Sequence, residues 1–115
     1  MMLITQAINA KLKANYTAQQ TNGDGASLKP PLKLFNPCGA ATWLISERDT
    51  DEPDQLFGLC DLGFGSPELG WVSLAEIESF KGPFGLGIER DRWFEPEKTL
   101  GEYADDARKA GRIAA

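Results

Sequence analysis

Four short apolar segments follow one another between residues 32 and 72, and turn-forming residues close each of them. The segments are residues 32–35, 41–47, 55–62 and 68–72, with Asn36-Pro37, the acidic run 48–54 and the run 63–67 between them. Their β-branched and aromatic residues predict strands. Connections this short favour antiparallel neighbours, because a parallel neighbour needs a crossover of about a dozen residues. This part of the chain is therefore predicted to form an antiparallel sheet.

A helix is predicted before these strands. Ile4, Ile8, Leu12 and Tyr16 recur every four residues, a spacing that places them on one face of a helix over residues 5–20. A threonine at the start of this segment is suited to the N-cap, because its hydroxyl can accept a hydrogen bond from an otherwise unpaired backbone amide. The pattern predicts an amphipathic helix.

Two later segments carry helix-start signals. Ser73 with Glu76, and Thr99 with Glu102, have the spacing of a capping box, in which the side chain and the backbone amide of each residue pair reciprocally. The first pair predicts a short helix over residues 74–81. The second pair predicts a last helix that begins after the threonine.

A fifth strand candidate, residues 87–94, lies between these two helices. The order of elements predicts an α+β fold: a single antiparallel sheet of about five strands, packed by an N-terminal helix, a short middle helix and a C-terminal helix. The length suits one domain covering residues 1–115.

The sequence contains no histidine, which narrows the chemistry available to it. A Ser-His-Asp or Cys-His apparatus, an imidazole general base and His-ligated metals are all excluded. The two cysteines, Cys38 and Cys60, are too few to form a structural zinc site alone. We expect them to be small, partly buried thiols, and we expect no cofactor and no metal site.

Charge is segregated along the chain. Residues 47–106 carry sixteen acidic residues against five basic ones, whereas both ends are basic. An acidic middle disfavours a nucleic-acid groove there and favours either a solvated surface or a partner with a basic surface. The candidates for a binding surface are Asp49, Asp51, Glu52, Asp54, Trp71, Glu89 and Asp91.

Nucleic-acid binding through the basic ends is the weaker alternative. It would use Lys11, Lys13, Arg108, Lys109 and Arg112, and it requires the two terminal helices to lie side by side. Scattered cations of this number give little phosphate affinity at physiological salt. No apolar run approaches the ~20 residues that span a bilayer, and the N-terminal residues do not resemble a secretion signal. We therefore expect no membrane contact and a cytoplasmic location.

Asp61 is the candidate for chemistry because it lies within an apolar strand segment. By alternation it shares a face with Phe57 and Leu59, where a carboxylate must be paired, hydrogen-bonded or protonated. One interpretation makes it an acid, base or ligand that approaches Glu68 across the turn. The other makes it a structural acceptor for amides of the turn, or a partner of Lys33.

The three tryptophans, Trp43, Trp71 and Trp93, each lie in a strand candidate. Core packing is the ordinary explanation, since aromatic side chains dominate small cores. An exposed tryptophan would instead mark an interaction hot spot.

Several strings of residues resemble a known family. They are Leu34-Phe35-x-Pro37 with the run 39–44, Gly-Leu-Cys-Asp-Leu-Gly at 58–63, Pro-Glu-Leu-Gly-Trp-Val-Ser-Leu at 67–74, and the run 85–91 with Phe94-x-Pro96. On these motifs the chain resembles a small bacterial domain-of-unknown-function family found on plasmids, integrative elements and phages. The resemblance implies an element-borne protein and transfers no catalytic residue.

Two functional hypotheses follow. The first is a non-enzymatic accessory protein of a mobile genetic element, which binds a host or element-encoded protein with a basic surface and so modulates host defence or DNA transfer. The second is a small carboxylate-based enzyme, with or without a metal ion, centred on Asp61 and Glu68 and assisted by Lys33 or Tyr16.

Overall fold

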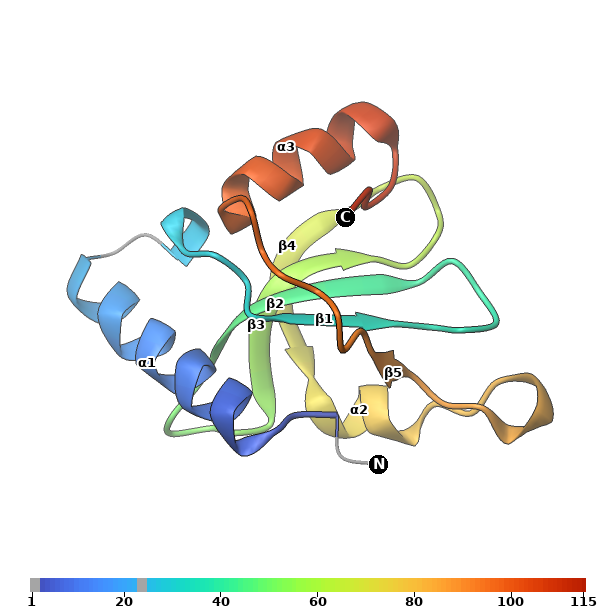
Figure 1. Cartoon of the computed structure of the whole chain (residues 1–115), viewed down its shortest axis with the longest axis horizontal. Coiled ribbons are helices and arrows are strands. Elements are labelled where there is room, and N and C mark those ends of the chain that lie inside the picture. The colour runs from blue at the N-terminus through green and yellow to red at the C-terminus, as the bar shows by residue number, and fades with distance from the viewer. Residues whose placement is uncertain (1–2, 23–24) are drawn as a thin grey trace.

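The computed structural model describes residues 3–22 and 25–115 and contains one five-stranded antiparallel sheet (Figure 1). The strands are β1 (Leu32–Phe35), β2 (Thr42–Arg48), β3 (Gln55–Asp61), β4 (Glu68–Ser73) and β5 (Glu89–Arg90). Their order across the sheet is β4-β3-β2-β1-β5. β1 to β4 form a run of hairpins, as the short connections predict, because each strand pairs with the next one along the chain.

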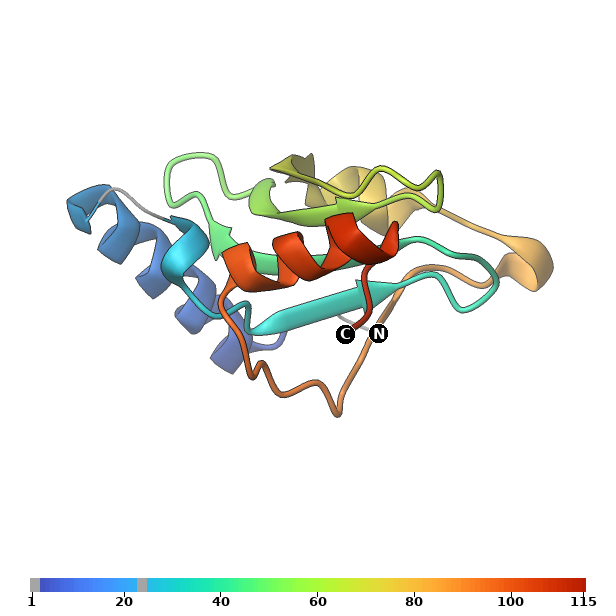
Figure 2. The same cartoon turned by 90° about the horizontal axis from the view of Figure 1, so that it is seen from above.

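Helices cover both faces of this sheet, so the predicted α+β fold is confirmed. They are α1 (Gln6–Asn22), α2 (Leu74–Ser79) and α3 (Leu100–Ala110), with short 3-10 turns η1 (Gly25–Ser27) and η2 (Pro83–Gly85). Figures 1 and 2 show α3 on one side of the sheet. α1 and α2 pack in a different core cluster from α3. α1 packs mainly along β2.

The alternation of side chains along the strands divides the core into two clusters. The first lies between the sheet, α1 and α2, and its centre includes Leu12, Leu34, Ile45 and Leu56. The second lies between the sheet and α3 and is built on Leu44, Leu59, Leu100, Ala104, Ala107 and Ile113. Adjacent residues of β2 therefore belong to different clusters, as a strand buried on both faces requires.

A β-bulge interrupts the pairing of β2 with β3. The register changes between Ile45 and Glu47, and Gly58 pairs with Ile45 just before it. A Cβ atom at residue 58 would lie 2.1 Å from the carbonyl oxygen of Leu44, so only glycine fits this close approach. The extra residue changes the face of the sheet toward which the side chains of β2 point after the bulge.

The predicted helix starts are confirmed at two helices. The Thr5 hydroxyl accepts the Ile8 amide at 3.1 Å, and Thr99 forms both bonds of a capping box with Glu102. At α2 the Ser73 hydroxyl accepts the Glu76 amide at 3.2 Å, but the carboxylate at this helix start comes from elsewhere in the chain.

The carboxylate that completes the start of α2 belongs to Asp54. It accepts the Ala75 amide at 2.8 Å and the Ser73 hydroxyl at 2.5 Å. Antiparallel pairing of Gln55 with Ser73 brings this aspartate beside the helix. The reciprocal capping box predicted here is therefore half right.

The fifth strand is shorter than predicted. Within the predicted segment 87–94, two residues, Glu89 and Arg90, pair with β1, and the Asp91 amide still donates to the Lys33 carbonyl oxygen at 3.0 Å. The Asp91 carboxylate then accepts the Trp93 amide at 2.9 Å and turns the chain away from the sheet.

Candidate functional site: an apolar groove with an acidic end

Asp61 is buried, with 3% of its surface exposed, and its carboxylate is used for architecture. One oxygen accepts the Gly63 amide at 2.8 Å, and the other accepts the Ile113 amide at 2.9 Å. The first bond is the turn contact that the structural interpretation predicts. The second attaches the segment after α3 to the end of β3.

The structure does not bring Asp61 and Glu68 together. Glu68 pairs across the strands with Cys60, and directly paired residues share a face of the sheet. Asp61 is the next residue after Cys60, so its side chain points to the opposite face. The two carboxylates therefore cannot divide acid and base roles at one site.

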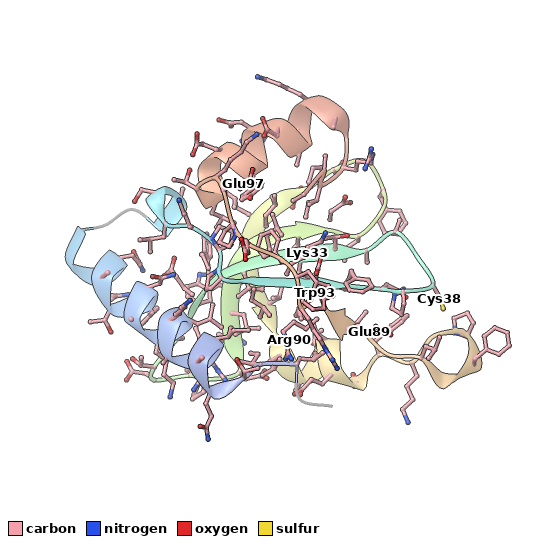
Figure 3. All side chains as sticks on the ribbon, in the orientation of Figure 1. Lys33, Cys38, Glu89, Arg90, Trp93 and Glu97 are labelled. Atoms are coloured by element: carbon pink, nitrogen blue, oxygen red, sulfur yellow. The ribbon has the colours of Figure 1, made fainter. Side chains whose placement is uncertain are left out.

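The polar contacts of Lys33 are with residues other than Asp61. Its ammonium group lies 3.6 Å from the Asp91 carboxylate and donates to the Ala115 carbonyl oxygen. Figure 3 shows Lys33 in the middle of β1, near Trp93. Lys33 thus fastens the loop after β5 to the sheet.

An apolar groove of about 550 Å³ crosses the face of the sheet that α2 partly covers. Trp43 of β2, Val72 of β4, Ile77 of α2 and Ile88 form its apolar floor. These residues come from three separated parts of the chain, so the groove is a product of the fold. The other lining residues are Asn36, Ala41, Gln55, Leu62, Trp71, Ser73, Glu76 and Phe80.

One end of the groove is acidic. Gln55 and Ser73 line this end, and Asp54 is bonded to the Ser73 hydroxyl. That hydroxyl, and then the Ala75 amide, lower the pKa of Asp54, so its carboxylate carries its charge at neutral pH. Glu76 lines the groove itself and is exposed.

The loop that leads to Asp54 holds further acids in a fixed conformation. The Asp49 carboxylate accepts the amides of Asp51 and Glu52 at 2.8 and 3.0 Å. It also accepts the Tyr16 hydroxyl, and burial followed by this carboxylate raises the pKa of Tyr16. Asp51 and Glu52 remain exposed. Four of the predicted binding-surface acids therefore lie in the loop at the acidic end of the groove.

The opposite end of the groove carries less charge, although Glu68, the first residue of β4, lies there. The connections 36–41, 62–67 and 81–87 contain one charged residue, Lys81. Figures 1 and 2 place the β1–β2 turn, the β3–β4 turn and η2 at the same end of the molecule, away from α1. Three exposed hydrophobic residues of this end are Leu62, Phe64 and Phe84, and the last two are 86% and 98% exposed.

The tryptophans divide between core and surface. Trp43 is buried, as core packing predicts, whereas Trp71 is half exposed and Trp93 is 89% exposed. The rings of Trp71 and Phe57 are 5.3 Å apart, and Tyr16 contacts Trp71 edge-on at 6.3 Å. Trp71 is therefore a supported aromatic at the rim of the groove, and sequence alone gave no sign that Trp93 is exposed.

The other predicted binding acids do not line the groove, although Ile88, next to Glu89, does. Glu89 and Asp91 belong to the β5 region on the far edge of the sheet, where Arg90 donates to the Leu3 carbonyl oxygen at 2.9 Å. Figure 3 shows Glu89 and Arg90 in this region. These two acids alternate with Arg90 and Arg92, and Asp91 is paired with Lys33, so the acids that adjoin the groove are those of the loop 49–54 and Glu76.

The basic ends do not form one patch. α1, with Lys11 and Lys13, and α3, with Arg108 and Lys109, pack on different core clusters. Arg108 is also paired with Asp105 at 3.0 Å. The side-by-side arrangement that nucleic-acid binding requires is not found.

Cys38 differs from expectation because it is exposed at the tip of the β1–β2 turn, where Figure 3 shows it. Cys60 is partly buried, as expected, and burial together with Glu68 raises its pKa to about 11. Within residues 3–22 and 25–115, no group of three or more Asp, Glu or Cys side chains could hold a metal ion. No helix in this part of the chain could cross a membrane.

Glu47 is a buried carboxylate that the sequence pattern did not single out. It is 1% exposed, and among the residues that the structure describes one of its carboxylate oxygens has no hydrogen-bond partner. Burial raises the pKa of Glu47, and a hydrogen bond from Gln19 opposes this rise. The bulge after Ile45 changes the alternation of side chains along β2, so alternation alone does not predict the direction of the Glu47 side chain.

A comparison with protein families decides what the chain is related to. The model of the family described as "Protein of unknown function (DUF2958)" matches residues 3–114. The chain belongs to the DUF2958 family. The match covers every strand and helix of this DUF2958 protein, so the groove lies within the family domain. No curated protein and no solved structure matches it.

Proposed function

We propose that this DUF2958 protein is a non-enzymatic accessory protein that binds another protein through the apolar groove. The observation that carries the proposal is the juxtaposition of an apolar floor with an acidic end. Apolar anchors supply much of the affinity of protein interfaces, and charges at the rim select the partner. Such a groove fits an apolar segment that carries Lys or Arg at one end.

The setting on a mobile genetic element is part of the same proposal. It is supported by the resemblance of the residues 58–63 and 67–74 to an element-borne bacterial family. In that setting the partner is a host or element-encoded protein with a basic surface, and binding would modulate host defence or DNA transfer. Net charge −5 favours association with such a partner.

Site-directed photo-cross-linking in a bacterial host tests the proposal. A photoreactive phenylalanine analogue at Phe80, which lines the groove, should give a discrete adduct whose cross-linked peptide is rich in Lys or Arg. The analogue at Glu95, an exposed residue outside the groove, is the matched control. Glu76→Lys in the Phe80 variant should remove the adduct. Equal adducts at both positions, or an adduct on an acidic peptide, would contradict the proposal.

A further inference from the structure

β4 forms one edge of the sheet, because the strand order places it beside β3 alone. Among the residues that the structure describes, no strand pairs with its other edge. An edge strand presents unpaired backbone amides and carbonyls that can pair with another chain. The outer edge of β4 is therefore available for pairing with another chain.

The groove borders the backbone of β4. Its lining includes three consecutive residues of this strand, Trp71, Val72 and Ser73. Because consecutive side chains of a strand point to opposite faces, all three can line one groove only where it also reaches the strand's backbone. An extended chain in the groove would thus lie within reach of the free edge.

The dimensions of the groove suit an extended segment. Gln55 and Leu62 both line it, and they are the first residue of β3 and the residue that follows its last one. Seven residue steps of a strand span about 23 Å at about 3.3 Å per residue. The groove therefore accommodates a segment of about seven extended residues.

The charges give this segment a direction. Asp54 and Glu76 lie at or near the Ser73 end of β4, whereas the other end of this strand has a single acid, Glu68, beside the apolar Leu62. Lys or Arg side chains would be attracted more strongly to the first end, which has more acids, and apolar side chains would pack at the second. A segment that is basic at one end and apolar along the rest is complementary to the whole length.

We propose that the partner binds by strand addition: an extended segment pairs with the free edge of β4, with its basic residues at the Asp54 and Glu76 end and its apolar side chains over Val72 and Ile77. This inference rests on the proposed function and specifies the form of the partner. In strand addition, backbone hydrogen bonds supply affinity and alternate side chains supply specificity.

Synthetic peptides test the inference. The parent is a nine-residue peptide with three lysines followed by alternating serine and leucine. Its matched control has glutamate in place of lysine. Two further peptides carry N-methyl groups on alternate backbone amides. One is methylated at its odd-numbered residues and the other at its even-numbered residues. Only one set can face β4, because every second amide of an added strand points toward its neighbour. Binding to the full chain is measured by amide NMR shifts at low salt.

The inference predicts that the lysine peptide shifts the amide signals of residues 68–73 and binds at least about tenfold more tightly than the glutamate peptide. One N-methylated peptide should lose about tenfold in affinity while the other stays within about threefold. If both N-methylated peptides bind like the parent, strand addition is wrong and the proposed function stands. If the lysine peptide does not bind, or binds no better than the glutamate peptide, both are wrong.

Discussion

The carboxylate of Asp61 accepts the backbone amide of Ile113 at 2.9 Å inside the protein, although the two residues are 52 positions apart. Because Ile113 is also buried against α3, this bond attaches the segment after the helix to the end of β3. The acid that is most suggestive of chemistry in the sequence thus connects two distant parts of the fold.

Replacing this carboxylate tests its structural role. In Asp61→Asn, one oxygen becomes an amide donor that faces a backbone N–H, so at least one buried hydrogen bond is lost. We expect unfolding to require about 1–3 kcal/mol less free energy, measured by urea denaturation. Asp105→Asn, on the exposed face of α3, should change stability by less than about 0.5 kcal/mol. Equal stability of Asp61→Asn and the parent would contradict the assignment.

Ionisation of Glu47 should lower the stability of the protein as pH rises, whereas ionisation of a salt-bridged acid raises it. Burial raises the pKa of Glu47, so the folded protein holds this proton more tightly than the unfolded chain, and ionisation reduces stability as pH rises above 4.5. Glu47→Gln removes this ionisation. The variant should gain stability relative to the parent between pH 4 and pH 7, as urea denaturation at each pH would show. A difference that is constant with pH, or that reverses, would contradict the buried carboxylate.

The two cysteines should differ in reactivity. Cys38 is exposed, whereas the pKa of Cys60 is raised to about 11, so Cys60 stays a thiol at pH 8. Brief iodoacetamide treatment of the folded protein should label Cys38 first, and mass spectrometry of the peptides would show the order. Both residues should be labelled in urea. Comparable labelling of Cys60 in the folded protein would show that the end of β3 opens more readily than the structure indicates.

The capping box of α3 gives a local stability test. Thr99→Ala removes the hydroxyl that accepts the Glu102 amide, and we expect a loss of about 1 kcal/mol in the free energy of unfolding. Thr99→Ser keeps the acceptor and serves as the control. If alanine and serine have the same effect, the loss does not come from the cap.

Local signals in the sequence were sufficient for most of the fold. The turns after residues 35 and 62, the four-residue apolar repeat and the Thr99 cap act over a few residues, and each predicted its element. The start of α2 was predicted only in part, because Asp54 reaches it from 19 residues before Ser73. The prediction made the fifth strand too long, because the turn at Asp91 competes with pairing to β1.

The groove could not be predicted in the same way. Its floor joins Trp43, Val72, Ile77 and Ile88, which only the packing of α2 and the loop after it brings together. The acidic loop was identified from its composition, but its position at one end of the groove depends on the pairing of Gln55 with Ser73. The sequence showed that the loop is acidic, but it did not show that the loop lies beside an apolar groove.

The central claim is that the acidic end of the groove selects a basic partner. Its most direct test compares Glu76→Lys, inside the groove, with Glu95→Lys, outside it, since both raise the net charge by the same amount. Titration of the nine-residue lysine peptide at low salt should show about five- to tenfold weaker binding to the first variant and less than about twofold weaker binding to the second. Equal weakening in both variants would show that overall charge alone governs binding, and unchanged affinity for Glu76→Lys would contradict a charge contact in the groove.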